Sequence, residues 1–283
     1  MKKRLRLIFT AAATLFLATA VLAAPPSPAA RVVFPADWRT DTWYGFTRHH
    51  FTFEGCKAWI VEPPQPAADH RWSWCTQWAT AFVPRVGTVA LLEHGFYHVH
   101  IDVFKYRASP EGVAIMRRFQ DKLVGMGLSP KANLIGMSWG GFLALRYAEE
   151  NPAQVCAIYL DAPVCDAADP DPSPVSGPQA SRRNQQIARC FGLSVEQLKS
   201  SPLNPVNNLK PIADAKIPVF AAIGQDDLVV NHATNFDVVE KNLRAAGGVL
   251  WKVVRRGAWG HHPHGFDDVS ALLDFHCKAR ERK

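Results

Sequence analysis

The chain has 283 residues, of which 48% are hydrophobic and 20% are charged, with 18 glycines and 21 prolines. These values are ordinary for a globular protein and allow one large domain with a buried core, which excludes a disordered, collagen-like or repeat-built chain. The formal net charge of +7 would suit an anionic partner if the cations were spread over the folded domain.

The N-terminal segment has the composition of a secretory signal peptide. Four cations precede an apolar run over residues 7–22, and the small residues Ala23 and Ala24 follow. Residues 1–24 carry no acid, so removing their four cations from the 32 Lys and Arg leaves 28 against 25 Asp and Glu, a balance of +3. This balance indicates no nucleic-acid partner. The four cations are Lys2, Lys3, Arg4 and Arg6.

The apolar run is shorter than the ~20 residues that span a membrane. We therefore expect residues 1–24 to be removed and the mature protein to be exported, either periplasmic or secreted, with no stable membrane association. An uncleaved N-terminal anchor is the alternative.

A linker rich in Pro and Ala is expected at residues 25–36, followed by one domain over residues 37–283. The first part of this domain predicts a β-hairpin, a loop rich in Pro and Trp, a helical segment, a strand, and a helix with Ser109 as N-cap and Pro110 at its first position. The first four of these elements lie at residues 47–61, 62–78, 82–94 and 97–103.

The second half alternates short apolar strands with helices, which is typical of a parallel sheet covered on both faces. An Asp-, Pro- and Ser-rich stretch at residues 165–212 interrupts this alternation. We expect it to be a small lid-like insertion after the sixth strand, with a short helix near residues 195–198. The expected strands are 132–135, 155–160, 218–223 and 250–254, and the expected helices are 140–150, 234–246 and 268–275.

The sequence Gly136-Met137-Ser138-Trp139-Gly140 stands between an expected strand and an expected helix. This is the context of the G-x-S-x-G nucleophile elbow, in which glycines leave room for a sharply turned serine. The Ser138 hydroxyl would lie at a helix N-terminus, where the N–H of Trp139 can stabilise a developing oxyanion. A glycine-rich turn without catalytic chemistry is the alternative.

A serine nucleophile needs a base, and the base needs an acid that orients it; for this elbow the chain order is Ser, acid, His. Asp226 and Asp227 follow the expected strand at residues 218–223, although both could be solvated turn residues. Among the histidines after the last strand, His261 lies nearest to the strand and is the preferred base, with His264 as the alternative.

The histidines at 261, 262 and 264 could instead hold a metal ion together with Asp226 and Asp227. Because the serine hypothesis already assigns a role to these residues, we expect no metal site. The six cysteines include no CxxC pair, so buried thiols with one or two disulfides are expected rather than a zinc site.

A second oxyanion donor normally comes from the loop after an early strand, and Trp74 in the segment 71–75 is the expected donor. Other tryptophans on the candidate loops, Trp72 and Trp259, could form an aromatic platform for a sugar or acyl group. A place in the hydrophobic core is the alternative for these rings.

Together these motifs resemble those of the α/β-hydrolases, and within them a bacterial group of exported serine esterases that includes acetylesterases and xylanase-associated enzymes. The resemblance covers residues from about 43 to 275. It implies Ser138 as nucleophile, Asp227 as the triad acid because it stands third after Gly224, and His261 as base, without a cofactor. It rests on the elbow, on Asp161-Ala162-Pro163-Val164-Cys165-Asp166, and on the segments 224–230 and 260–264.

The sequence thus predicts an α/β-hydrolase fold and an exported serine hydrolase that cleaves carboxylic esters through an acyl-enzyme. The expected partner is a small-molecule or carbohydrate ester, with an acetylated carbohydrate as one candidate. A serine peptidase of the same fold is the first alternative, which the small insertion disfavours. A non-catalytic binding protein is the second, which the complete set of Ser, Asp and His disfavours.

Overall fold

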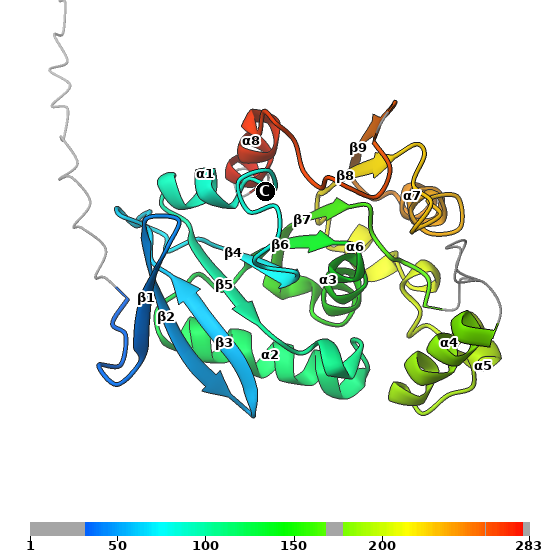
Figure 1. Cartoon of the computed structure of the whole chain (residues 1–283), viewed down its shortest axis with the longest axis horizontal. Coiled ribbons are helices and arrows are strands. Elements are labelled where there is room, and N and C mark those ends of the chain that lie inside the picture. Colours follow the sequence, from blue (N-terminus) through cyan, green and yellow to red (C-terminus); the bar gives the residue numbers. More distant parts are fainter. Residues whose placement is uncertain (1–31, 168–177, 258, 280–283) are drawn as a thin grey trace, which may run out of the picture.

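The computed structural model describes residues 32–167, 178–257 and 259–279 (Figure 1). The signal peptide expected at residues 1–24 lies outside these ranges. Within them, no helix has the length and apolar character that crossing a membrane requires.

The centre of the fold is a sheet that contains nine strands within the described residues, in the order β1-β2-β3-β5-β4-β6-β7-β8-β9. The pairs β1–β2, β2–β3 and β3–β5 are antiparallel, and the pairs from β5–β4 to β8–β9 are parallel. The strands are β1 (Arg39–Trp43), β2 (Phe46–Phe53), β3 (Cys56–Val61), β4 (Trp72–Gln77), β5 (Tyr97–Ile101), β6 (Ala132–Met137), β7 (Val155–Asp161), β8 (Val219–Gly224) and β9 (Leu250–Arg255).

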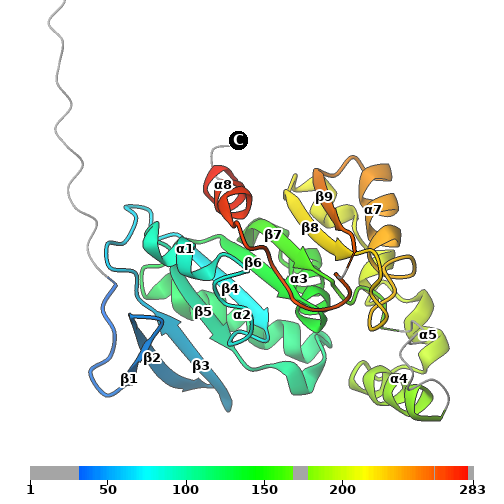
Figure 2. The same cartoon turned by 45° about the horizontal axis from the view of Figure 1, so that its top comes forward.

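Helices cover both faces of this sheet (Figures 1 and 2). Ile135 of β6 packs in one apolar cluster with residues of α1 and α8, whereas Leu134 packs in another with residues of α2, α3, α6 and α7. Because neighbouring strand residues face opposite helix layers, every residue of β4, β6 and β7 is buried. The helices are α1 (Thr88–Glu93), α2 (Pro110–Gly125), α3 (Trp139–Glu150), α4 (Pro178–Cys190), α5 (Val195–Ser200), α6 (Lys210–Asp214), α7 (Phe236–Ala245) and α8 (Ser270–Lys278).

Most of the predicted elements are present, with bounds that differ by a few residues. The hairpin is formed by β2 and β3, and the Ser109 hydroxyl caps α2 by accepting from the Gly112 N–H at 3.5 Å. The prediction of a loop at residues 62–78 is wrong, since this segment contains β4. Both faces of β4 are buried, its polar residues included, and Trp72 and Trp74, which we interpreted as loop residues, are core residues.

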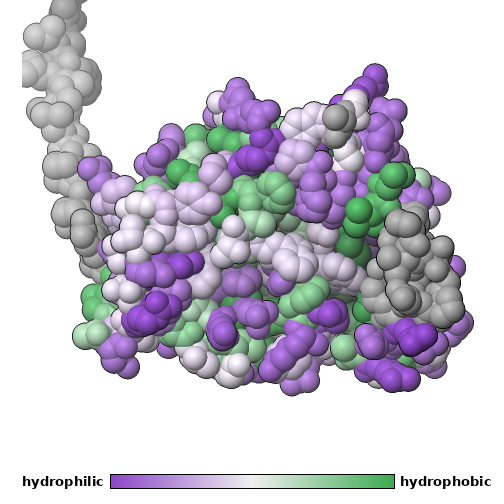
Figure 3. All heavy atoms as spheres, viewed as in Figure 1, coloured by the Kyte–Doolittle hydropathy of each residue, from purple (hydrophilic) through white to green (hydrophobic). Residues whose placement is uncertain are grey.

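The insertion follows β7, not a sixth strand, and it carries the helices α4, α5 and α6 rather than one short helix. In Figures 1 and 2, α4 and α5 lie together at the end of the molecule away from β1. Asn204 joins the later part of the insertion to its first residues, since its amide nitrogen donates to Asp166 Oδ1 at 2.7 Å and its oxygen accepts from the Ala167 N–H at 3.1 Å. Hydrophilic and hydrophobic side chains are interspersed over the face of the molecule seen in Figure 3.

Gly141, in the first turn of α3, is required by a close approach of the chain. A Cβ at this position would lie 2.3 Å from Pro163 Cβ, so we expect Gly141→Ala to lower the free energy of unfolding by about 1–3 kcal/mol. Gly125, the last residue of α2, is the matched control because a Cβ there meets nothing within 4 Å. Gly125→Ala should be neutral or stabilising by up to about 1 kcal/mol. Equal urea midpoints for the two variants would contradict the close approach.

Candidate active site

Ser138 lies at the turn between β6 and α3 with φ of 49° and ψ of −122°. This left-handed backbone is costly for a residue with a side chain, and the surrounding chain must hold it in place. The Ser138 N–H donates to the Asp161 carbonyl at 2.9 Å, and the Ser138 carbonyl accepts from the Val164 N–H at 2.9 Å. A Cβ at Gly136 would lie 2.8 Å from the Gly140 oxygen, so the turn also requires glycine there.

The turn places Ser138 at the N-terminus of α3. The Trp139 N–H is the first of this helix and has no carbonyl partner within it, so it is available to an anion beside Ser138. The end of β4 is fastened to the same turn, since the Thr76 hydroxyl donates to the Gly140 carbonyl at 2.7 Å. The chain that follows β4 therefore begins next to the helix N-terminus.

The structure brings the three predicted residues into one chain of hydrogen bonds. His261 Nε2 lies 3.1 Å from Ser138 Oγ, and His261 Nδ1 lies 2.8 Å from Asp227 Oδ2. Since a carboxylate only accepts, the Nδ1–H of His261 donates to Asp227, which leaves the Nε2 lone pair to accept from the Ser138 hydroxyl. His261 and Asp227 are buried, with exposed fractions of 7% and 8%.

Asp227 is the acid that the structure places at the site, whereas Asp226 is exposed. Asp227 Oδ1 accepts from the N–H groups of Val229 and Val230, each at 2.8 Å. Burial acts to raise the pKa of Asp227, but the bond with His261 and these two N–H groups hold it below its ordinary value. The carboxylate therefore stays ionised and can fix the tautomer and orientation of His261.

His264, the alternative base, is bonded elsewhere. Its Nδ1 lies 2.7 Å from Oδ1 of the fully buried Asp161 at the end of β7. The same carboxylate accepts from Arg255 Nη2 at 2.9 Å, from the Gly265 N–H at 2.8 Å and from the Tyr159 hydroxyl. Asp161 thereby anchors the segment that carries His261.

Asp161 is a residue whose part in the site the sequence reasoning missed. Its place at the end of a buried strand, within the motif at residues 161–166, was the available indication. Burial acts to raise the pKa of Asp161, but the side chains of His264 and Arg255 hold it below its ordinary value. The same burial, together with the neighbouring Asp161, raises the pKa of Tyr159 well above its usual range.

The predicted sites for Trp72 and Trp74 are wrong, because both side chains are fully buried in β4. Trp72 Nε1 donates to the Ser129 carbonyl at 2.7 Å, and the Trp74 ring packs against Trp72 and Tyr147. Trp74 also lies inside the sheet, between β5 and β6, where its backbone belongs to the strand ladder. Neither residue can contact a substrate or an oxyanion.

The other two predicted tryptophans, Trp139 and Trp259, lie outside the strands of the sheet. Trp139 is partly buried, with its ring 5.6 Å from that of Phe142. Trp259 is also partly buried, and its ring lies over the guanidinium groups of Arg255 and Arg85, 5.2 and 5.3 Å from the ring centroid. In this arrangement Trp259 covers the anchoring arginine and does not form an open shelf.

A cavity of about 610 Å³ opens at the carboxyl ends of β4 and β5, on the sheet edge where Ser138 follows β6. It is lined by Gln77 and Trp78 from the end of β4, by His100 and Asp102 from β5 and the residue after it, and by the start of β3. Trp78, with 43% of its surface exposed, lies against Phe104, whose ring is 6.3 Å from that of Trp139. The cavity is therefore one strand away from the elbow, and sequence reasoning did not identify it.

Two histidines outside the candidate site, His98 and His276, are fully buried. Burial lowers the pKa of His98 to about 3 and that of His276 to about 3, so both are uncharged at neutral pH. The thiols of Cys56, Cys75 and Cys165 are buried and free, as the sequence suggested for part of the cysteines.

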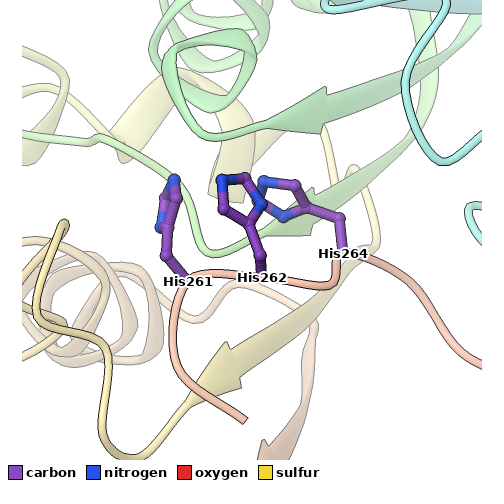
Figure 4. A group of neighbouring side chains, drawn as sticks. All are labelled: His261, His262 and His264. Carbon is purple, nitrogen blue, oxygen red and sulfur yellow. The ribbon is translucent and has the colours of Figure 1, made fainter.

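One loop carries His261, His262 and His264, whose side chains lie next to one another (Figure 4). One ring nitrogen of each lies within 4.8 Å of one nitrogen of each of the others. Within the described residues, this cluster is the group of side chains that could hold a metal ion.

The family model for the alpha/beta hydrolase fold matches residues 40–205, which is more than half of the chain. The chain belongs to this family, and its mostly parallel sheet flanked by helices is the fold that the sequence predicted. The search of curated proteins found no match to this chain.

Solved structures with the same fold include several hydrolases. An S-formylglutathione hydrolase from Agrobacterium tumefaciens aligns with 86% of this chain and 98% of its own, with a TM-score of 0.58 and 15% identity. The esterase EstE5, soaked with p-nitrophenyl butyrate, aligns with 85% of this chain and 86% of its own, with a TM-score of 0.57 and 16% identity. An acylaminoacyl peptidase from Pyrococcus horikoshii aligns with 83% of this chain and 40% of its own, with a TM-score of 0.57 and 11% identity.

Asp161→Asn tests the anchor of the His261 segment. It leaves Arg255 buried without its carboxylate, so we expect the free energy of unfolding at pH 7 to fall by about 3–5 kcal/mol. Because the folded pKa of Asp161 is lowered, its contribution is present above ~pH 4, the unfolded value, and is lost as the pH falls through the folded pKa. Urea unfolding at pH 7 and pH 3 should therefore show a larger acid loss for wild type than for the variant.

Asp267→Asn is the control, because this exposed carboxylate pairs with Arg85 at the surface and should contribute little. Equal acid losses for wild type and Asp161→Asn would contradict the assigned role of Asp161.

Proposed function

We propose that this protein is an exported serine hydrolase that cleaves carboxylic esters with Ser138 as nucleophile, His261 as base and Asp227 as the acid that orients it. The observation that carries the proposal is the chain of bonds from Ser138 Oγ through His261 to Asp227, at 3.1 and 2.8 Å. The position of Ser138 at a strained turn and a helix N-terminus supports it.

In the proposed mechanism His261 Nε2 takes the hydroxyl proton as Ser138 Oγ attacks the ester carbonyl carbon. The tetrahedral intermediate collapses, the alcohol leaves with the proton from His261, and the acyl group stays on Ser138. Water then attacks the acyl-enzyme, with the same histidine as base, and releases the carboxylic acid. The ionised Asp227 stabilises the imidazolium that forms in both steps.

The oxyanion would be held by two backbone N–H groups. The first is that of Trp139 at the start of α3. We assign the second to the chain directly after β4, at Trp78, because Thr76 fastens the end of β4 to the elbow. This assignment replaces Trp74, whose backbone lies inside the sheet.

The cavity beside Trp78 supports an ester whose alcohol carries polar groups, such as an acetylated carbohydrate. Its lining combines tryptophan faces, at positions 59 and 78, with histidine, carboxylate and cationic side chains. Sugars present both apolar ring faces and hydroxyl groups, so this mixture suits them. The exported location is proposed on the composition of residues 1–24.

Esters are favoured over amides by the small insertion in this fold. The insertion after β7 interrupts the alternation of strands and helices, and it is short. A comparison of hydrolysis rates for an acetyl ester and an aminoacyl amide separates the two substrate classes.

Labelling with a fluorophosphonate tests the proposed nucleophile without knowledge of the substrate. We expect one adduct on Ser138 by peptide mass mapping, and none in Ser138→Ala. His261→Ala and Asp227→Asn should label more slowly by a factor of about 10³ or more, because the hydroxyl loses its base or the base loses its orientation.

His264→Ala is the matched histidine control and should lose only part of the labelling rate, because His264 is bonded to Asp161 and not to Ser138. No adduct on a folded sample, or an equal loss in the two histidine variants, would contradict the proposed roles.

Trp78→Ala tests the cavity. The backbone N–H remains, so we expect kcat for an acetylated sugar to stay within about twofold while KM rises by roughly fivefold, equivalent to about 1 kcal/mol of lost contact. Trp251→Ala, at another exposed tryptophan on β9, should change neither constant. A fall in kcat without a change in KM would show that the ring does not bind the leaving group.

A further inference from the structure

We propose that His261, His262 and His264 form a binding site for a divalent transition-metal ion such as Zn²⁺, and that the bound ion inhibits the enzyme. The metal site rests on the three imidazole rings alone. Its inhibitory effect also rests on the proposed function, because it requires His261 to act as the base for Ser138.

The three rings lie close enough together to bind one ion. Their centroids are 4.8, 5.0 and 4.9 Å apart, and one nitrogen from each lies within 4.8 Å of the others. A tetrahedral Zn²⁺ with Zn–N bonds of ~2.0–2.1 Å needs ligand nitrogens about 3.3 Å apart. Small rotations of the side chains would close the remaining distance, and His262 is exposed and has room to move.

Two of the three rings are already oriented as metal-bound histidines usually are. A ligating histidine generally donates its other ring N–H to a carboxylate, a backbone carbonyl or water, which fixes the tautomer and raises the basicity of the ligand. Here the Nδ1 of His261 is bonded to Asp227 at 2.8 Å, and the Nδ1 of His264 is bonded to Asp161 at 2.7 Å. In each ring Nε2 is then the atom with the lone pair, and all three rings project to the same side of the loop (Figure 4).

Metal binding and catalysis would compete for one lone pair. His261 Nε2, which lies 3.1 Å from Ser138 Oγ, accepts the hydroxyl proton in the proposed mechanism. An ion that shares this lone pair prevents proton transfer, and the serine loses its base. No covalent bond changes, so a chelator that removes the ion restores the lone pair. Imidazole ligands suit Zn²⁺, Cu²⁺ and Ni²⁺ and do not suit Mg²⁺ or Ca²⁺, so the latter two should not inhibit.

The binding experiment is a calorimetric titration of the metal-free protein with Zn²⁺ in a buffer that does not chelate it. We expect one Zn²⁺ per chain for wild type and for Ser138→Ala. His262→Ala removes an exposed ligand without touching the bonds of His261, and it should weaken binding about 10- to 100-fold. His94→Ala, at the exposed histidine that caps the C-terminus of α1, is the matched control and should bind like wild type.

The inhibition experiment measures the fluorophosphonate labelling rate of Ser138 with increasing Zn²⁺, followed by EDTA. Wild type should lose labelling at saturating Zn²⁺ and recover it with EDTA, whereas His262→Ala should label normally without metal and need at least about tenfold more Zn²⁺. Co²⁺ in place of Zn²⁺ should give the visible absorption bands of a tetrahedral site, and His262→Ala should abolish them.

Equal Zn²⁺ affinity in wild type and His262→Ala would overturn the metal site, because the ion would then be held elsewhere. Binding that depends on His262 but leaves the labelling rate unchanged would overturn the inhibition. If metal-free wild type is never labelled, the proposed function fails, and the calorimetric comparison still decides whether the three histidines bind the ion.

Discussion

The left-handed backbone of Ser138 is the constraint on which the rest of the site depends. A strained turn of this kind costs of order 1–3 kcal/mol and persists only where its surroundings hold it. Here β7 supplies the Asp161 carbonyl on one side, the segment after β7 supplies the Val164 N–H on the other, and Thr76 holds the helix that follows. Glycines 136 and 141 allow these neighbours to approach. The burial of β4, β6 and β7 on both faces makes the support rigid.

The side chain of Asp161 links this turn to the base. Its backbone holds Ser138 while its carboxylate holds Arg255, His264 and Gly265 around the loop that carries His261. The distance between nucleophile and base is therefore governed by one residue at the end of β7. The buried ion pair with Arg255 is tolerated because every oxygen of the carboxylate is bonded, which offsets the cost of removing it from water.

The sequence was informative where a local pattern has one physical cause. The glycines around Ser138, the order of Asp227 and His261, and the cap at Ser109 each follow from local geometry or from the needs of one reaction, and the structure brings these residues together as the pattern indicates. The sequence was uninformative where the packing of side chains determines the structure. Trp72 and Trp74 lie in β4, which is buried on both faces together with its polar residues, so polarity does not distinguish this strand from a loop. The role of Asp161 and the cavity beside Trp78 arise from segments that the sheet brings together from distant parts of the sequence.

The attachment of Arg255 and Gly265 to one carboxylate has a consequence for how this chain can diversify. Both ends of the loop that bears His261 are hydrogen-bonded to Asp161 of β7, through Arg255 and Gly265. Arg255 Nη1 also donates to the carbonyls of Pro263 and Gly265, each at 3.1 Å. The position of the base is thus fixed relative to β7, although the base lies about a hundred residues later in the sequence. Segments between Ser138 and Arg255, including the insertion and α7, can change in length without displacing His261. Evolution can therefore reshape the entrance to the site while the reacting atoms keep their places.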